Sequence, residues 1–163
     1  MRLIDEKFSR MPLRFFAQSS LAFVAVAIIA VYLGVITNGA VVAALGASAF
    51  IVFATPNHDT AQPRRLIGGH VICIGIGLLG SVPFRFNILP RNEVSVGLIA
   101  AAAVGLAILA MTMTDTEHPP AAGNALAFAI SVRGTEHVAF ISGAVICLAV
   151  VHRPFRPWLR DLT

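Results

Sequence analysis

The sequence has 163 residues, of which 57% are hydrophobic and only 12% charged, and its mean hydropathy is +0.82. Such a composition is far more apolar than that of a soluble domain and indicates an integral membrane protein. The net charge of +4 comes from 12 basic residues placed around the apolar runs, with no basic surface rich in aromatic residues, so we expect contact with the lipid bilayer and none with nucleic acid.

The first 14 residues mix basic and acidic side chains and are too short for an organelle transit peptide, so we interpret them as a cytoplasmic N-terminal segment. Residues 15–36 then run for 22 positions without a charge. This stretch is longer than the core of a signal peptide, and more apolar sequence follows it directly. We therefore predict a first membrane span that is retained.

Residues 40–55 are apolar over 16 positions, which at 1.5 Å per residue cover about 24 Å of a hydrocarbon core of ~30 Å. The segment is predicted to be either a helix tilted into a thin region or a re-entrant helix. It leads into a first polar island, residues 56–65, which places a threonine, a carboxylate, a histidine and two prolines just before an apolar helix at 66–84.

A second polar island, residues 112–124, follows a 21-residue span at 94–114 and holds two acids, a histidine, three threonines and a proline pair. Residues 121–132 and 138–151 are apolar over only 12 and 14 positions, and the basic tail at 152–163 carries the interfacial Trp158. The sequence predicts an all-α integral membrane fold. We expect residues 15–151 to form a compact bundle of four to six hydrophobic helical segments, some of them short, broken or re-entrant.

Small residues recur at every fourth position in three segments, which indicates faces for close helix packing and favours a homo-oligomer. Cys73 and Cys147 both lie inside apolar runs and are interpreted as packing residues rather than a disulfide or a metal pair. The small-residue stripes are Gly39/Ala43/Ala47, Gly69/Cys73/Gly77/Ser81 and Gly97/Ala101/Gly105.

Basic residues suggest an orientation in the membrane. If all six segments cross, the N-terminal segment, the first island and the tail share one side with nine basic residues, and the other side holds three. The positive-inside bias then places both termini in the cytoplasm, and a bacterial inner membrane is the expected location. If the two shortest segments are re-entrant, four crossings remain and the termini still share one side, so the bias does not choose between the two topologies.

The second island has the features of a helix that begins inside the protein. Pro119 and Pro120 suit the first turn of a helix, where their missing N–H groups would lack a partner in any case. The free N–H groups of Ala121 and Ala122 are then predicted to point, with the positive end of the helix dipole, into the break, which suits an anion. Broken helices of this kind recur at the binding sites of transporters.

The run Glu117-His118-Pro119-Pro120-Ala121 entering a short apolar helix, preceded by Ala61-Gln62-Pro63 and Gly68-Gly69-His70, resembles the HPP family of integral membrane proteins. The resemblance covers nearly the whole chain. It implies a membrane domain and the passage of a small anion, because relatives in cyanobacteria and chloroplast envelopes are associated with nitrite transport. It supplies no ligand set and no cofactor.

We therefore predict transport of a small inorganic anion, nitrite first, at the helix break, with no catalytic residue, metal or cofactor. Arg64 and Arg65 could add an attracting charge at the same mouth. The candidate translocation residues are Thr114, Asp115, Glu117, His118, Pro119, Pro120, Ala121 and Asn124 of the second island and its helix, together with His58, Asp59, Gln62, Arg64, Arg65 and His70.

Structural interpretations stay open beside this one. Asp115, Glu117 and His118 could simply cap and close the break, His70 could be a packed core histidine, and His58 with Asp59 could form a loop cap paired with Arg64 or Arg65. Arg133 and Glu136 are interpreted as a surface loop pair.

Two other functions are kept. An intramembrane metal enzyme could use the acids and histidines of the islands, but the sequence has no His-Glu-x-x-His and no Cys-x-x-Cys spacing. A non-catalytic subunit packed against a larger membrane partner would use the small-residue faces.

A carboxylate beside an anion path repels the passenger, so an anion site here requires Glu117 to be protonated, paired with a cation or turned away. Burial lowers the proton affinity of a histidine, and pairing with a carboxylate raises it. Proton uptake by His118 would compensate the charge of the anion, which makes proton-coupled movement our hypothesis for this pair.

Overall fold

The computed structural model describes residues 6–33, 39–131 and 135–163, and in these ranges the regular structure is entirely helical. The all-α class is therefore confirmed for the described part of the chain. The elements are α1 (Glu6–Arg10), α2 (Pro12–Leu33), α3 (Gly39–Ala54), the 3-10 turn η1 (Asp59–Ala61), α4 (Pro63–Arg85), α5 (Glu93–Met113), the 3-10 turn η2 (Pro119–Ala121), α6 (Ala122–Ile130) and α7 (Thr135–Phe155).

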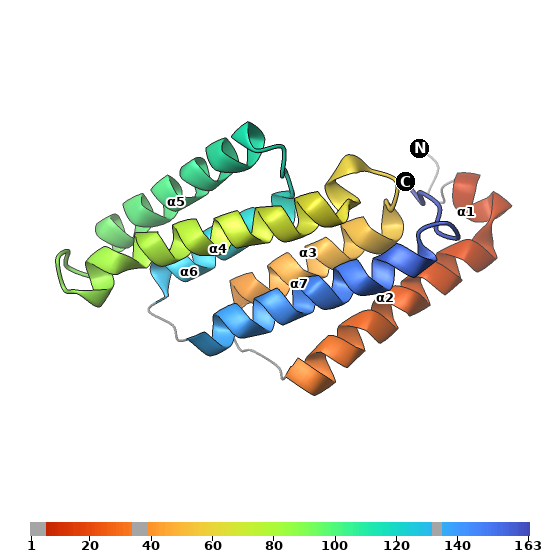
Figure 1. Cartoon of the computed structure of the whole chain (residues 1–163), viewed down its shortest axis with the longest axis horizontal. Coiled ribbons are helices and arrows are strands. Elements are labelled where there is room, and N and C mark those ends of the chain that lie inside the picture. The colour runs from red at the N-terminus through yellow and green to blue at the C-terminus, as the bar shows by residue number, and fades with distance from the viewer. Residues whose placement is uncertain (1–5, 34–38, 132–134) are drawn as a thin grey trace.

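The helices run alternately up and down the bundle, so that both polar islands and the C-terminal tail gather near one end (Figure 1). The α4–α5 loop lies at the opposite end. Within the described ranges, four helices, α2, α4, α5 and α7, are long and apolar enough to cross a membrane, and α3 is a shorter apolar helix. Helix α6 continues the alternation and runs from the end that holds the islands toward the opposite end (Figure 1).

The short helix α6 occupies the middle of the bundle, behind α4 in Figure 1, and packs against α4, α5 and α3. Five of its nine residues are buried. Glycine at position 77 of α4 permits this approach, because a Cβ there would lie 2.6 Å from the Cβ of Phe128 and 2.8 Å from the carbonyl oxygen of Ala125. The short helix after the break is therefore held in the core of the bundle.

Only one of the three small-residue stripes packs inside the chain. The α4 stripe, from Gly69 to Ser81, is buried at all four positions and faces the second island and α6. The α5 stripe is exposed at all three positions, as are Ala43 and Ala47 of the α3 stripe. The side-chain environment of Gly39 lies outside the described residues.

The last hydrophobic segment is longer than its predicted bounds of 138–151. Helix α7 extends over 21 residues and is long enough to span, so a 14-residue re-entrant segment is the wrong interpretation. Glu136 and His137 lie in its first turn, and His152 and Arg153 lie in its last turn. Polar residues at both ends of a spanning helix are tolerated, and a count that stops at them underestimates the length.

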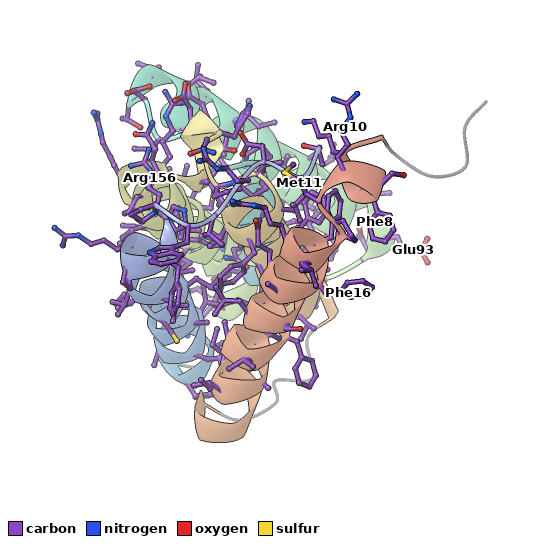
Figure 2. The ribbon with its side chains drawn as sticks, turned by 90° about the vertical axis from the view of Figure 1, so that its right-hand side faces the viewer. Phe8, Arg10, Met11, Phe16, Glu93 and Arg156 are labelled. Atoms are coloured by element: carbon purple, nitrogen blue, oxygen red, sulfur yellow. The ribbon has the colours of Figure 1, made fainter. Side chains whose placement is uncertain are left out.

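The C-terminal tail folds back onto α2 and α3 through a buried glutamine. Gln18, only 4% exposed, donates to the carbonyl oxygens of Phe53 (2.5 Å) and Arg160 (2.9 Å) and accepts the backbone N–H of Arg160 (3.0 Å). On another side of α2, Phe16 points away from the bundle (Figure 2) and is 64% exposed. Helix α2 therefore has a polar anchor inside and an apolar face outside.

Candidate functional site

The second island begins where Asp115 turns the chain at the end of α5. Its φ of 53° is left-handed, a conformation that Asp tolerates better than most residues. The N–H of Thr116 then bonds back to the carbonyl of Met111 at 3.0 Å, which closes the helix end. The turn exposes Asp115 and directs the following residues, Thr116 to His118, into the bundle, where Thr116 and His118 are buried.

An ion-pair cluster joins the second island to the first. Arg65 pairs with Asp115 at 2.5 Å and with Glu117 at 3.0 Å, and Arg64 lies 3.6 Å from Asp115. Arg64 also donates to the carbonyl of Thr114 at 3.2 Å. Two cations and two carboxylates balance one another, so this cluster carries no net charge.

Beneath the ion pairs lies a fully buried set of uncharged polar groups, for which we use the name core network: Ser48, His70, His118 and Asn124. None is more than 2% exposed. Ser48 Oγ lies 3.1 Å from His70 Nε2 and 2.9 Å from His118 Nε2. Asn124 Nδ2 lies 2.6 Å from His70 Nδ1, so the three side chains of α3, α4 and α6 meet His118 at the break.

The core network is anchored to the first island by a backbone contact. His118 Nδ1 lies 2.8 Å from the carbonyl oxygen of Thr60, and the two imidazole rings lie 5.2 Å apart between centroids. His118 lies in the connection between α5 and η2, outside the spanning helices. Burial lowers the pKa of its imidazole, and the hydrogen bond to Thr60 opposes this effect.

Glycines on α4 make room for the second island. A Cβ at position 69 would lie 2.9 Å from His118 Cβ and 2.9 Å from the carbonyl oxygen of Thr116, and a Cβ at position 68 would lie 2.7 Å from Thr116 Cγ2. The backbone of the island therefore rests almost in contact with the helix. The Gly68-Gly69-His70 triplet is explained by this approach, with the histidine placed one residue later inside the core.

A cavity of about 260 Å³ borders the break between α5 and η2. A much smaller one of about 50 Å³ borders His70 between α4 and α7. The larger cavity is lined by Ile108, Met111, Thr112, Glu117, His118, Pro119 and Ala122. Its polar groups are few, and His118 connects it directly to the core network.

The predicted free N–H groups at the helix start are not free. The N–H of Ala121 bonds to the carbonyl of His118 at 2.9 Å, and the N–H of Ala122 bonds to the carbonyls of Pro119 and Pro120. The proline pair forms a 3-10 turn, whose bonds reach back one residue less than those of an α-helix and so use these donors. The two N–H groups predicted to face an anion are therefore not available to one.

Within the first island, His58 caps η1, with Nδ1 2.8 Å from Thr60 Oγ1, and Asp59 accepts from Gln62 at 2.9 Å. The predicted loop cap at His58 is confirmed, but its pairing with Arg64 or Arg65 is wrong, because these arginines reach across to the second island. Glu136 is exposed and lies 3.4 Å from His137, and Arg133 is outside the described residues.

These contacts bring the two islands together at the mouth where Arg64 and Arg65 were expected, but sequence reasoning missed Ser48, the group that joins the two histidines. Ser48 is the one polar side chain in the α3 sequence, a signal that could have marked it. The cysteines are both free. Among the residues that the structure describes, no three His, Cys, Asp or Glu side chains are grouped so that they could hold a metal ion.

Comparison with known proteins identifies the family. A family model described as "HPP, transmembrane region" matches residues 9–153. One transmembrane protein of Dictyostelium discoideum is 35% identical over 116 residues, covering 66% of this chain and 38% of the relative. A second from the same organism is 36% identical over 80 residues, covering 49% and 24%. The chain thus spans less than half the length of either relative.

No solved structure matches the chain. The family model begins within α1 and ends in the last turn of α7, and it includes both polar islands together with α2, α4, α5 and nearly all of α7. The resemblance carried by the His-Pro-Pro run is confirmed. The chain belongs to the HPP family of integral membrane proteins.

Proposed function

We propose that this protein transports a small inorganic anion, with nitrite as the first candidate, past the break between α5 and α6. The observation that carries the proposal is the cavity beside His118, which meets the buried core network on one side and the ion-pair cluster on the other. Nitrite itself is taken from the family resemblance. The proposal assigns no catalytic step to the chain.

The electrostatics of the cavity are compatible with an anion. Glu117 lines it, and an unpaired carboxylate would repel the passenger, but Arg65 lies 3.0 Å from this carboxylate and offsets its charge. With that charge offset, His118 is the lining group that can become positive. A proton on its imidazole would compensate the charge of the passenger.

The basic residues also fit a cytoplasmic position for the end that holds both islands. Arg64 and Arg65 lie there with the tail, which carries Arg153, Arg156 and Arg160. We propose that this end faces the cytoplasm of a bacterial cell and that the protein lies in the inner membrane.

Uptake into liposomes tests the function. The purified chain is reconstituted and supplied with nitrite, nitrate, formate, bicarbonate or chloride, with and without an inward proton gradient. We expect saturable nitrite uptake above that of empty liposomes, increased by the gradient. Arg85→Gln serves as the control because Arg85 is exposed at the end of α4, beside the α4–α5 loop and at the opposite end of the bundle from both islands. No anion uptake by folded, inserted protein would refute the proposal.

The exposed stripe on α5 favours a second candidate, a subunit that packs against another membrane protein or a second copy of itself. Gly97, Ala101 and Gly105 all face outward, and a Cβ at either glycine would meet no neighbour within 4 Å. Small exposed residues allow close approach of another helix. Nitrite uptake by the purified chain alone would distinguish a transporter from an accessory subunit.

A further inference from the structure

We propose that the core network is a proton-binding site that takes up one proton at His118 while His70 stays neutral. The hydroxyl of Ser48 donates to a different acceptor before and after the proton binds. This inference concerns the site itself and does not depend on which passenger, if any, the protein carries. It follows from the order in which donors and acceptors meet along the network.

The carbonyl oxygen of Thr60 fixes one end. A carbonyl can only accept, so His118 Nδ1, 2.8 Å away, must carry a hydrogen and donate it. In the neutral ring Nε2 is then the acceptor. The Ser48 hydroxyl, 2.9 Å from that nitrogen, must therefore donate to His118.

The donors and acceptors of the remaining hydrogen bonds, from Ser48 to Asn124, then follow. With its single hydrogen given to His118, Ser48 Oγ can only accept from His70, so His70 carries its hydrogen on Nε2, 3.1 Å from the oxygen. His70 Nδ1 becomes an acceptor, and the amide nitrogen of Asn124, 2.6 Å away, donates to it. Each of these four contacts then joins one donor to one acceptor, and the two histidines hold opposite tautomers.

One more proton fits without moving a side chain. If it binds to His118 Nε2, that nitrogen becomes a donor, and the Ser48 hydroxyl can turn to the carbonyl oxygen of Ala44, 2.9 Å away. Ser48 Oγ then accepts from both imidazoles through its two lone pairs. His70 could take the proton only if the Asn124 amide turned, so that its Oδ1, which has no hydrogen-bond partner, replaced the NH₂ group that faces His70 Nδ1.

Few charges surround the network. Helices α3 and α6 contribute no titratable side chain, and α5 contributes none near the break. The groups on the other elements packed around it are Arg64, Arg65, His70 and Cys73 on α4, Asp115 and Glu117 before η2, His58 and Asp59 at η1, and Glu136, His137, His152 and Arg153 on α7. Glu117 shares the 260 Å³ cavity with His118 and is adjacent to it in the sequence.

Nitrogen-15 NMR of the full chain labelled at histidine, in nanodiscs, tests the proposal directly. The protein has five histidines, and Gln variants of His58, His137 and His152 leave the signals of the network pair. At neutral pH we expect His118 protonated at Nδ1 and His70 at Nε2. As the pH falls, His118 should become doubly protonated first. Identical tautomers, or titration of His70 ahead of His118, would overturn the proposal.

Two variants probe the relay in opposite directions. Ser48→Ala removes a partner that binds the charged ring more strongly than the neutral one, so the titration midpoint of His118 should fall by about one pH unit, a tenfold loss of proton affinity. Asn124→Asp supplies an acceptor that forces the hydrogen of His70 onto Nδ1, which should raise the midpoint of His118. Ser81→Ala is the control, since this buried hydroxyl bonds only the carbonyl of Leu78 on its own helix.

These results are independent of transport. If Ser48→Ala does not fold, the tautomers of the unmodified protein still decide the question. Opposite tautomers with no anion uptake would support the proton site and refute the transport proposal. Anion uptake with identical tautomers would support the transport proposal and refute the proton site. A midpoint unchanged in folded Ser48→Ala would count against the relay.

Discussion

The tightest approach at any glycine that the structure describes predicts a strong effect of a single methyl group. Gly77→Ala would place a Cβ 2.6 Å from the Cβ of Phe128, where ordinary contact begins at 3.4 Å, so α6 must move away by about 0.8 Å. Neither opposing atom can rotate aside, because one is a Cβ and the other the carbonyl oxygen of Ala125. Overpacking of this kind costs about 1–3 kcal/mol, which outweighs the gain of ~1 kcal/mol from replacing glycine in a helix.

Thermal unfolding in detergent measures the effect, and Gly75→Ala on the same helix is the matched control. Gly75 is exposed, and a methyl group added there would meet nothing within 4 Å, so only the helix gain of ~1 kcal/mol applies. We expect Tm to fall for Gly77→Ala and to stay equal or rise for Gly75→Ala. Because α6 carries Asn124, the shift should also weaken its 2.6 Å contact with His70. Equal Tm values for both variants would refute the packing assignment of α6.

Three further predictions concern the charges and the buried polar groups. Arg65→Gln leaves Glu117 unpaired beside the cavity and should reduce the initial rate of nitrite uptake about tenfold. The double variant that adds Glu117→Gln should recover the rate, and an unchanged rate for Arg65→Gln in liposomes would contradict the pairing argument. Burial lowers the pKa of His118, so its contribution to folding stability is fully present above the ordinary pKa of about 6.5 and is lost as the pH falls below that value. Between pH 7.5 and 5.5, Tm should therefore decline less in His118→Gln than in the unmodified protein. Equal slopes of Tm against pH in the two proteins would argue against this. Gln18→Leu removes the two hydrogen bonds to Arg160 that hold the tail and a third to Phe53 of α3, and it should speed proteolysis of the C-terminus at least several-fold, whereas unchanged cleavage would show that other contacts suffice.

The helical fold could be predicted because long charge-free runs have few alternatives in a membrane. The side of each helix that faces the protein interior could not be predicted. In a soluble protein the polar face of a helix points outward, but lipid and the protein interior are both apolar, so the stripes at Gly69 and at Gly97 look alike in sequence. Only the three-dimensional packing separates them: the first touches the second island and α6, and the second faces outward.

The polar islands were visible in the sequence because charges and prolines are expensive inside an apolar chain. Their pairing was not, since Arg65 and Asp115 are separated by 50 positions and Asp59 was the nearer carboxylate. Ser48 was missed for another reason. A serine hydroxyl can bond a carbonyl of its own helix, and Ser48 Oγ lies 2.9 Å from that of Ala44, so a lone serine in an apolar helix gives little warning of a second role.

The break between α5 and α6 resolves a conflict between burial and charge. Ionised groups at the centre of the bundle would require partners in a region where the chain offers almost none, and the structure keeps Asp115 and Glu117 at the end, balanced by two arginines. What enters the core instead is a neutral set of polar groups, every nitrogen of the two imidazoles having a partner. A continuous helix in place of the break would give its own carbonyls and N–H groups to internal bonds and would leave the Thr60 carbonyl without His118. Breaking the helix therefore lets the protein place a group that can gain a single charge, His118, beside a cavity while the resting interior stays uncharged.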